Sequence, residues 1–90
     1  MAILVNIPTP MRQHTENKAS VETAGSSVRQ VLDSLGQKYP GLTGRIFENG
    51  QVRRFVNIYL NDEDIRYLES LDSAVKDGDV ISIIPAVAGG

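Results

Sequence analysis

Cysteine is missing from this sequence, and histidine occurs once, as His14. Without cysteine, no disulfide or cysteine-based zinc site can hold the fold together, and no thiol nucleophile is present. His14 lies in a polar stretch, and no serine motif of the nucleophile-elbow type accompanies it, so we expect no catalytic residue. Apolar residues make up 41% of the chain, which predicts a fold stabilised by its own hydrophobic core.

An excess of positive charge and a long hydrophobic run are also missing. Nine basic and eleven acidic residues give a formal net charge of -2, which argues against nucleic acid as a partner, because phosphate binding needs a concentrated basic surface. No stretch of about 18 apolar residues occurs, and the N-terminus lacks the pattern of a signal peptide. We therefore expect a cytoplasmic protein without a membrane partner.

Length and composition predict one domain followed by a short tail. The 90 residues suit a single compact core. We assign residues 1–85 to the domain and residues 86–90 to a flexible C-terminal tail. At roughly 3.3 Å per residue, this tail reaches about 16 Å from the body, far enough to enter a cleft in another protein.

Several segments have the β-branched, alternating character of strands. They are residues 2–7, 19–23, 52–60 and 80–84, with residues 65–67 as a possible further short strand. The first two predict a hairpin with a long loop. Residues 61–64 and 77–79 have turn composition, and Pro85 should end the pairing of the last strand. In the longest strand, alternation places Val56, Ile58 and Leu60 toward the core.

One amphipathic helix is predicted between the second and third strands. Ser27 and Gln30 have the spacing of a capping box, which marks a helix start, and Pro40-Gly41 marks the end. Helical spacing is shared by the apolar residues Val28, Val31, Leu32, Leu35 and Tyr39. Residues 41–50 look irregular, and residues 68–74 look like a loop or a single helical turn.

This order of elements predicts an α+β fold of the β-grasp (ubiquitin-like) class. It should have a mixed sheet of four to five strands with one main helix on one face. A ferredoxin-like fold would need a second full helix, and neither residues 41–50 nor residues 68–74 are long enough to supply it.

The chain closes with two glycines, Gly89 and Gly90. Such a pair arises by chance at a given terminus about once in 200 chains, so alone it is only moderately specific. Glycine has no Cβ, so the pair can present the Gly90 carboxylate inside a narrow cleft of another protein. Ala88 and Val87 complete the segment that presents it. A frayed end is the alternative interpretation.

Partner recognition is expected on the surface of the third and last strands. Alternation places Phe55 and Tyr59 on one face, and Val80 and Ile84 join them if the two strands are adjacent. The alternatives are an apolar partner site and a small cluster under residues 11–18. The arginines Arg53, Arg54 and Arg66 either steer partners or form an ordinary solvated face.

Two further patterns carry little weight. Residues 61–64 hold three acids but lack the alternating ligands and the glycine of a calcium loop, so we expect no metal site. Gly25, Ser26 and Ser27 precede the helix without the other glycines and the lysine of a phosphate loop. Helix capping accounts for them.

Nearly the whole sequence resembles the ubiquitin-like sulfur carriers of the MoaD/ThiS superfamily, and most closely the CysO-type carriers of cysteine biosynthesis. The resemblance is carried by residues 5–9 with Arg12, His14 and Thr15, by residues 54–66, by residues 77–79, and by the ending from Pro85 to Gly90. Residues 54–66 discriminate best, because a terminal Gly-Gly is shared by many ubiquitin-like proteins. The segment 47–52 is shorter than is usual in the CysO-type branch.

The resemblance implies a carrier with no catalytic activity and no bound cofactor. An E1-like adenylating enzyme would use ATP to activate the Gly90 carboxylate, and a sulfur donor would convert it to a thiocarboxylate. A PLP-dependent cysteine synthase would transfer that sulfur to an acceptor made from an activated serine. A JAMM-type zinc metalloprotease would then release cysteine and regenerate Gly90.

Two other roles remain open from the resemblance. A MoaD-like small subunit of molybdopterin synthase would form a stable complex with the large subunit. A ubiquitin-like protein modifier would join Gly90 to lysines of other proteins.

Overall fold

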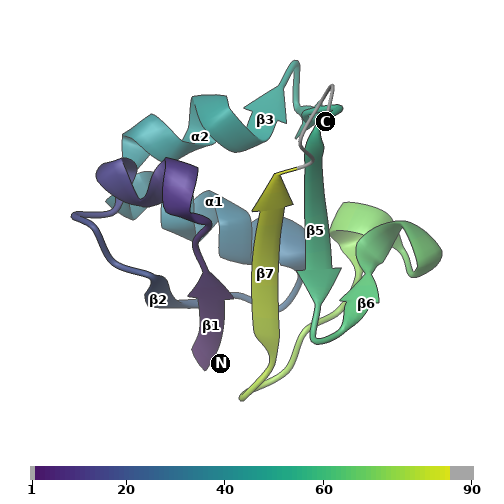
Figure 1. The fold of residues 1–90 in the computed structure, drawn as a ribbon. Helices are drawn as coiled ribbons and strands as arrows, with labels where there is room; N and C mark the ends of the chain where they lie inside the picture. The colour runs from purple at the N-terminus through teal and green to yellow at the C-terminus, as the bar shows by residue number, and fades with distance from the viewer. Residues whose placement is uncertain (1, 86–90) are drawn as a thin grey trace.

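The computed structural model describes residues 2–85, which form a five-stranded sheet backed by helices (Figure 1). In spatial order the strands are β2 (Ser20–Ala24), β1 (Ala2–Asn6), β7 (Val80–Pro85), β5 (Val56–Leu60) and β6 (Glu63–Asp64). β1 and β7 run parallel, and the other neighbours run antiparallel. The sheet is therefore mixed, as the sequence predicts.

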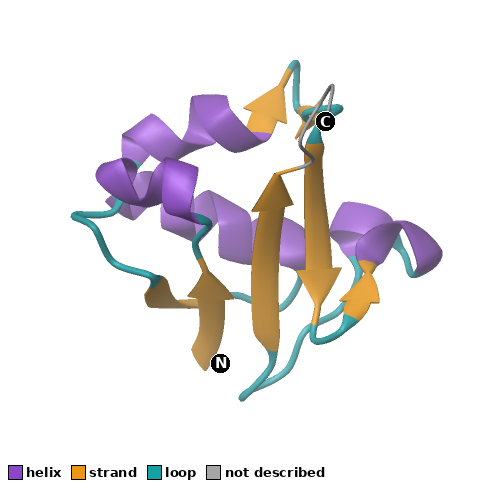
Figure 2. Ribbon diagram, viewed as in Figure 1, coloured by secondary structure: helices purple, strands orange, loops and turns teal. Residues whose placement is uncertain are grey.

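Two α-helices lie on one side of the sheet and leave the other side uncovered by helices (Figures 1 and 2). α1 (Val28–Lys38) crosses behind the central strands, and α2 (Pro40–Ile46) packs against α1 and the 3₁₀ helix Thr9–His14. The core between the layers includes Ile3, Val5, Val31, Leu32, Leu35, Leu42, Ile46, Ile58, Ile81 and Ile83. The predicted inward side chains Val56, Ile58 and Leu60 are all buried.

The helix start is predicted correctly, with one difference in its cap. Ser27 is the N-cap, and its Oγ accepts a hydrogen bond of 3.2 Å from the Gln30 N–H. The Gln30 side chain reaches one residue further back than in a capping box, because its Oε1 accepts from the N–H and Oγ of Ser26. Both interactions satisfy polar groups at the helix start.

The second helix, α2, corrects the prediction of irregular structure after Pro40. Proline suits the first helical turn because its missing N–H has no partner there in any case. Leu42 and Ile46 are one helical turn apart, and both are buried. Tertiary burial of this pair explains why a seven-residue segment with two glycines is helical.

Residues 47–55 form a small hairpin and a turn instead of the start of a long strand. β3 (Phe47–Glu48) pairs with β4 (Gln51–Val52) through Asn49 and Gly50, both with positive φ. The Val56 N–H then donates to the Arg53 carbonyl oxygen, which closes a turn before β5. The predicted strand over residues 52–60 is therefore wrong before Val56, and Phe55 lies outside it.

The segment between β5 and β7 differs from the prediction in two places. The expected turn 61–64 is shorter, because Glu63–Asp64 forms β6. The expected strand 65–67 is wrong, since Ile65–Tyr67 is a 3₁₀ helix capped by the Asp64 carboxylate. A single turn at Ser70–Asp72 and the tight turn at Gly78, with φ of 90°, agree with expectation.

β7 ends at Pro85, one residue later than predicted. Pro85 still occupies a position opposite Val56 in the β5–β7 register. Strand ends tolerate proline because the lost N–H donor falls at the end of the ladder. The tail assigned to residues 86–90 lies outside the described residues.

Within residues 2–85 the longest helix is α1, with 11 residues, and none is long and apolar enough to cross a bilayer.

Candidate functional site

The tail residues Val87, Ala88, Gly89 and Gly90 lie outside the described part of the chain, but their attachment point is well defined. The tail follows β7, which lies between β1 and β5. Five register positions join β7 to β5, and three join it to β1. β1 holds the start of β7, and β5 holds it as far as Pro85, the point from which the tail leaves the sheet.

The uncovered side of the sheet carries an apolar surface that contains three of the predicted recognition residues, Tyr59, Val80 and Ile84. β5 and β7 are adjacent, which is the condition that the prediction set. Exposed fractions are 52% for Phe55, 43% for Ile84 and 39% for Leu4. We call Leu4, Tyr59, Val80 and Ile84 the outer-face patch; Phe55 is exposed in the turn before β5.

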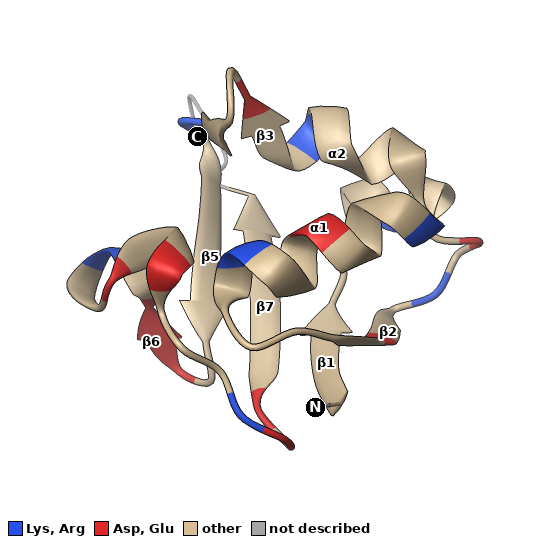
Figure 3. Ribbon diagram, turned by 180° about the vertical axis from the view of Figure 1, so that it is seen from behind, with Lys and Arg blue, Asp and Glu red and all other residues tan. Residues whose placement is uncertain are grey.

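Leu4 is a member of this patch that the sequence interpretation missed. Its partner in the parallel β1–β7 register is Val80. Ile3 and Val5 on either side are fully buried, so strict alternation over residues 2–6 would have identified Leu4. Seen from the helix side, β1, β5 and β7 carry no charged residue (Figure 3). The patch is therefore supported by three uncharged strands.

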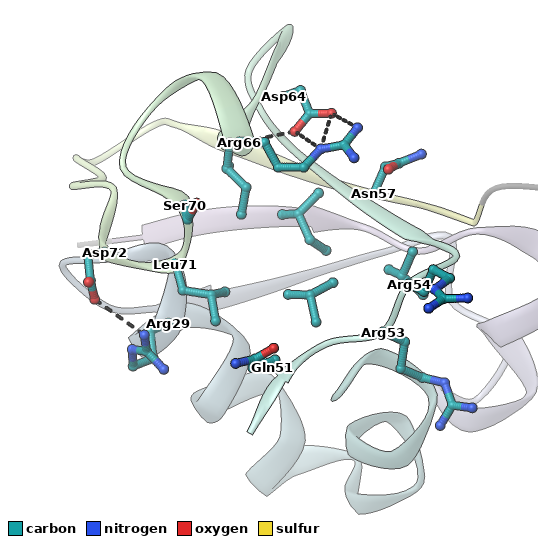
Figure 4. Close-up of a pocket in the computed structure, with 14 residues that line it drawn as sticks. Arg29, Gln51, Arg53, Arg54, Asn57, Asp64, Arg66, Ser70, Leu71 and Asp72 are labelled. Carbon is teal, nitrogen blue, oxygen red and sulfur yellow. Dashed lines mark hydrogen bonds and ion pairs between the residues drawn. The ribbon is translucent and has the colours of Figure 1, made fainter. Parts of the chain in front are cut away.

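The other two predicted recognition residues, Arg54 and Arg66, line a groove along the free edge of β5. Figure 4 shows this groove, which we call the β5-edge groove. Its volume is about 620 Å³. The lining residues on which the argument below depends are Arg29, Val52, Arg53, Arg54, Val56, Ile58, Asp64, Ile65, Arg66, Leu71 and Asp72.

Asp64 fixes the position of the Arg66 guanidinium at one end of the groove. Arg66 Nη2 lies 2.7 Å from Asp64 Oδ2, and Arg66 Nε lies 3.2 Å from both carboxylate oxygens. These bonds, followed by one from the Arg66 N–H, lower the pKa of Asp64 from its ordinary value of 3.8, against an opposing effect of burial. The same pair raises the pKa of Arg66.

The remaining predicted arginine, Arg53, contacts the β3 hairpin and the end of α2. Its Nη1 donates to the Gly44 carbonyl oxygen at 3.1 Å, and its Nη2 lies 3.7 Å from a Glu48 carboxylate oxygen. His14, the single histidine, packs close to Gly41 and lies far from β5 in sequence and in element contacts. Within residues 2–85, no three acidic or histidine side chains are grouped as metal ligands.

Comparison with known proteins relates the whole chain to one family. The sequence matches the ThiS family over residues 5–90. It is 43% identical over 93 aligned residues to the sulfur carrier protein CysO of Mycobacterium tuberculosis, covering 100% of both chains. It is also 42% identical over 65 residues to small archaeal modifier protein 3 of Haloferax volcanii, covering 72% of this chain and 71% of that protein.

The fold agrees with these sequence relationships. A chain in the crystal structure of the Amycolatopsis orientalis BexX/CysO complex superposes with a TM-score of 0.92 and 42% identity. The match covers 98% of this chain and 99% of that one. It confirms the predicted β-grasp, with α2 as an addition to the single helix expected. The chain belongs to the ThiS family of ubiquitin-like sulfur carriers.

Proposed function

We propose that this chain carries sulfur as a thiocarboxylate on Gly90 and donates it for cysteine biosynthesis. The observation that carries the proposal is the full-length similarity to the sulfur carrier CysO. The attachment of the tail to the central strand β7 supports it, because the body can dock on an enzyme while the tail extends into that enzyme's site. The protein then acts as the substrate of partner enzymes and performs no catalysis itself.

The chemistry begins with activation of the carboxylate by an E1-like adenylating enzyme. A Gly90 oxygen attacks the α-phosphorus of ATP, pyrophosphate leaves, and an acyl-adenylate forms. Sulfide then attacks the acyl carbon, and AMP leaves with the bonding electrons. The product is a thiocarboxylate, in which one carboxylate oxygen has been replaced by sulfur.

Two further partner enzymes complete the proposed cycle. In a PLP-dependent cysteine synthase, the sulfur adds to the acceptor derived from an activated serine. The Gly90 acyl group then shifts from sulfur to the amino group and forms an amide. A JAMM-type zinc metalloprotease hydrolyses that amide, which releases cysteine and restores the carboxylate.

We assign recognition by these enzymes to the outer-face patch. Leu4 and Ile84 expose apolar surface, and by strand alternation they point away from the core into which Ile3 and Ile83 point. Ile84 lies next to Pro85, so a partner bound at the patch is close to the start of the tail. Exposed apolar clusters of this kind commonly mark protein interfaces.

Intact-mass analysis tests the proposal. The purified chain is incubated with an E1-like enzyme, ATP and sulfide, and we expect a mass increase equal to the difference between sulfur and oxygen. Reactions without ATP, and the same chain lacking Gly90, should show no increase. An unchanged mass in the complete reaction would contradict the proposal.

Similarity to small archaeal modifier protein 3 favours a second candidate function, attachment of Gly90 to lysines of other proteins. Tryptic digests of cells that express the chain would then contain lysines carrying residues 77–90 as a branch, because Lys76 is the last tryptic site before Gly90. Loss of Gly90 would remove these branched peptides. A stable complex with the large subunit of molybdopterin synthase, together with no transfer to a cysteine synthase, would instead indicate a MoaD-like role.

A further inference from the structure

We propose that the β5-edge groove binds an extended, acidic segment of a partner protein, at a surface separate from the outer-face patch. The inference goes beyond sulfur transfer, because it concerns residues 51–72 and holds whether or not Gly90 is activated. It rests on three features of the groove, which are an open strand edge, an apolar floor and a cationic rim.

The first feature is the incomplete pairing of β5. On one side β5 pairs with β7 along all five residues. On the other side β6 pairs only with Tyr59 and Leu60. The segment from Val56 to Ile58 thus has no strand beside it on this edge among the described residues. An open edge of this kind accepts an added strand through main-chain hydrogen bonds.

The directions of the backbone hydrogen bonds around β5 agree with an open edge at Val56 to Ile58. The Asn61 N–H donates to the Val80 carbonyl oxygen, toward β7. The Val56 N–H donates instead to the Arg53 carbonyl oxygen. Backbone groups of successive residues in a strand point to opposite edges. The Val56 carbonyl and the N–H and carbonyl of Ile58 therefore face the groove, whereas the Val56 N–H is already bonded within the turn. An extended segment is therefore the shape that this edge accommodates.

The second feature is the apolar floor. It is formed by Val52, Val56, Ile58, Ile65 and Leu71. These side chains come from β4, β5 and the two 3₁₀ turns after β6, so the floor is built by three separate parts of the chain. Alternate side chains of an added strand point to the same face. Small apolar side chains at alternate positions would contact this floor.

The third feature is the charge of the rim. Four arginines and two aspartates line the groove. The Arg29–Asp72 pair is 3.4 Å long and exposed, and exposed pairs hold their partners weakly. Arg54 is exposed and forms no ion pair with another described residue. The chain as a whole is acidic, with a formal net charge of -2, so this rim is a local excess of positive charge. Carboxylates on the bound segment complement it.

The groove lies apart from β7, the strand that the tail follows. The tail follows β7, whereas the groove lies on the edge of β5 that faces away from β7. None of Leu4, Tyr59, Val80 or Ile84 lines the groove. A partner segment in the groove therefore leaves most of the outer-face patch accessible to an enzyme.

A blocked pentapeptide of alternating glutamate and valine, with glutamate at both ends, is the probe for this test. It is titrated into the full ¹⁵N-labelled chain, and amide shifts are followed by NMR. We expect saturable shifts at residues 54–58 and 64–71. The matched peptide with lysine in place of glutamate, and a version N-methylated along one edge, should bind at least about fivefold more weakly. No saturable shift, or shifts centred on Leu4 and Ile84, would overturn the proposal.

Variants of two exposed arginines identify the charged contact. Arg54→Gln should weaken binding of the glutamate peptide about two- to fivefold, the range expected for one exposed ion pair. Arg45→Gln makes the same charge change on α2, outside the groove, and should leave binding unchanged. Equal effects of the two variants would contradict a defined site.

Two other occupants are distinguished by the same titration. If the peptide binds only after deletion of residues 86–90, the protein's own tail occupies the groove. If shifts at residues 54–58 appear with protein concentration and without peptide, a second copy occupies it. Either result would overturn the assignment to a partner segment.

Discussion

At the scale of single residues, Asp64 shows how one side chain supports both fold and groove. Its carboxylate caps the 3₁₀ helix Ile65–Tyr67 by accepting from the Arg66 N–H at 2.9 Å. The same carboxylate holds the Arg66 guanidinium through Nε and Nη2. Asp64 is buried whereas Arg66 is exposed. The acidic partner thus anchors the pair to the body and fixes the direction of the basic one.

We predict that Asp64→Asn lowers the free energy of unfolding at neutral pH by about 1 kcal/mol, because the amide can still cap the 3₁₀ helix but loses the charge-assisted bonds to the Arg66 guanidinium. Because the native pKa of Asp64 is lowered, its contribution is complete above the ordinary value of 3.8 and is lost as the pH falls through the native pKa. Urea unfolding at several pH values measures this. The difference between wild type and variant should shrink below pH 3.8.

Asp62→Asn is the matched control, since Asp62 is exposed and forms no ion pair with another described residue. It should change stability by less than about 0.5 kcal/mol at every pH. A difference for Asp64→Asn that stays constant down to acid pH would show that the charge of Asp64 plays no part.

At the scale of elements, α2 depends on tertiary contact more than on local preference. It contains Gly41 and Gly44, and glycine is a poor helix former. Its N-cap, Tyr39, makes no side-chain capping bond. Burial of Leu42 and Ile46 compensates for both. Sequence patterns therefore predicted α1, which has a cap and four buried apolar positions, and failed for α2.

Alanine substitutions at two helical glycines, Gly44 and Gly36, should change the free energy of unfolding differently. A Cβ at Gly44 would meet no atom within 4 Å, so Gly44→Ala should raise the free energy of unfolding by about 0.5–1 kcal/mol. A Cβ at Gly36 would clash with the Thr43 Oγ1 on α2, which would have to move, so Gly36→Ala should gain less or lose stability. Urea unfolding of both variants measures the difference. A larger gain for Gly36→Ala would contradict the close contact of α1 with α2.

At the scale of the whole molecule, the sheet separates structural and recognition roles between its two faces. Ile83 points into the core and is 2% exposed, whereas its neighbour Ile84 points outward. The helices cover the first face (Figure 2), and the outer-face patch belongs to the second. The tail continues from the same strand, β7. One strand therefore contributes to the core, to the patch and to the attachment of the tail.

Threonine substitutions at these two neighbours separate the roles. Ile83→Thr should cost at least about 2 kcal/mol of stability, because it removes buried apolar surface and buries a hydroxyl. Ile84→Thr should change stability by less than about 0.5 kcal/mol yet slow the conversion of Gly90 to the thiocarboxylate. Urea unfolding and time-resolved intact mass measure the two effects. Leu68→Thr, an exposed apolar change elsewhere, should affect neither. Normal conversion by Ile84→Thr would exclude the patch from recognition.

The sequence by itself determined the β-grasp, the faces of β5 and β7, the start of α1 and the family. These features follow from periodicity, capping and a long similar block, all of which are local along the chain. Only the tertiary structure decided that residues 40–46 are helical and that β5 begins at Val56. It also decided that Arg54 and Arg66 line the groove at the edge of β5 and are not part of the outer-face patch. The physical reason for α2 is that burial of Leu42 and Ile46 depends on packing against α1 and against the 3₁₀ helix Thr9–His14, which is distant in sequence. Local patterns carry no record of such neighbours.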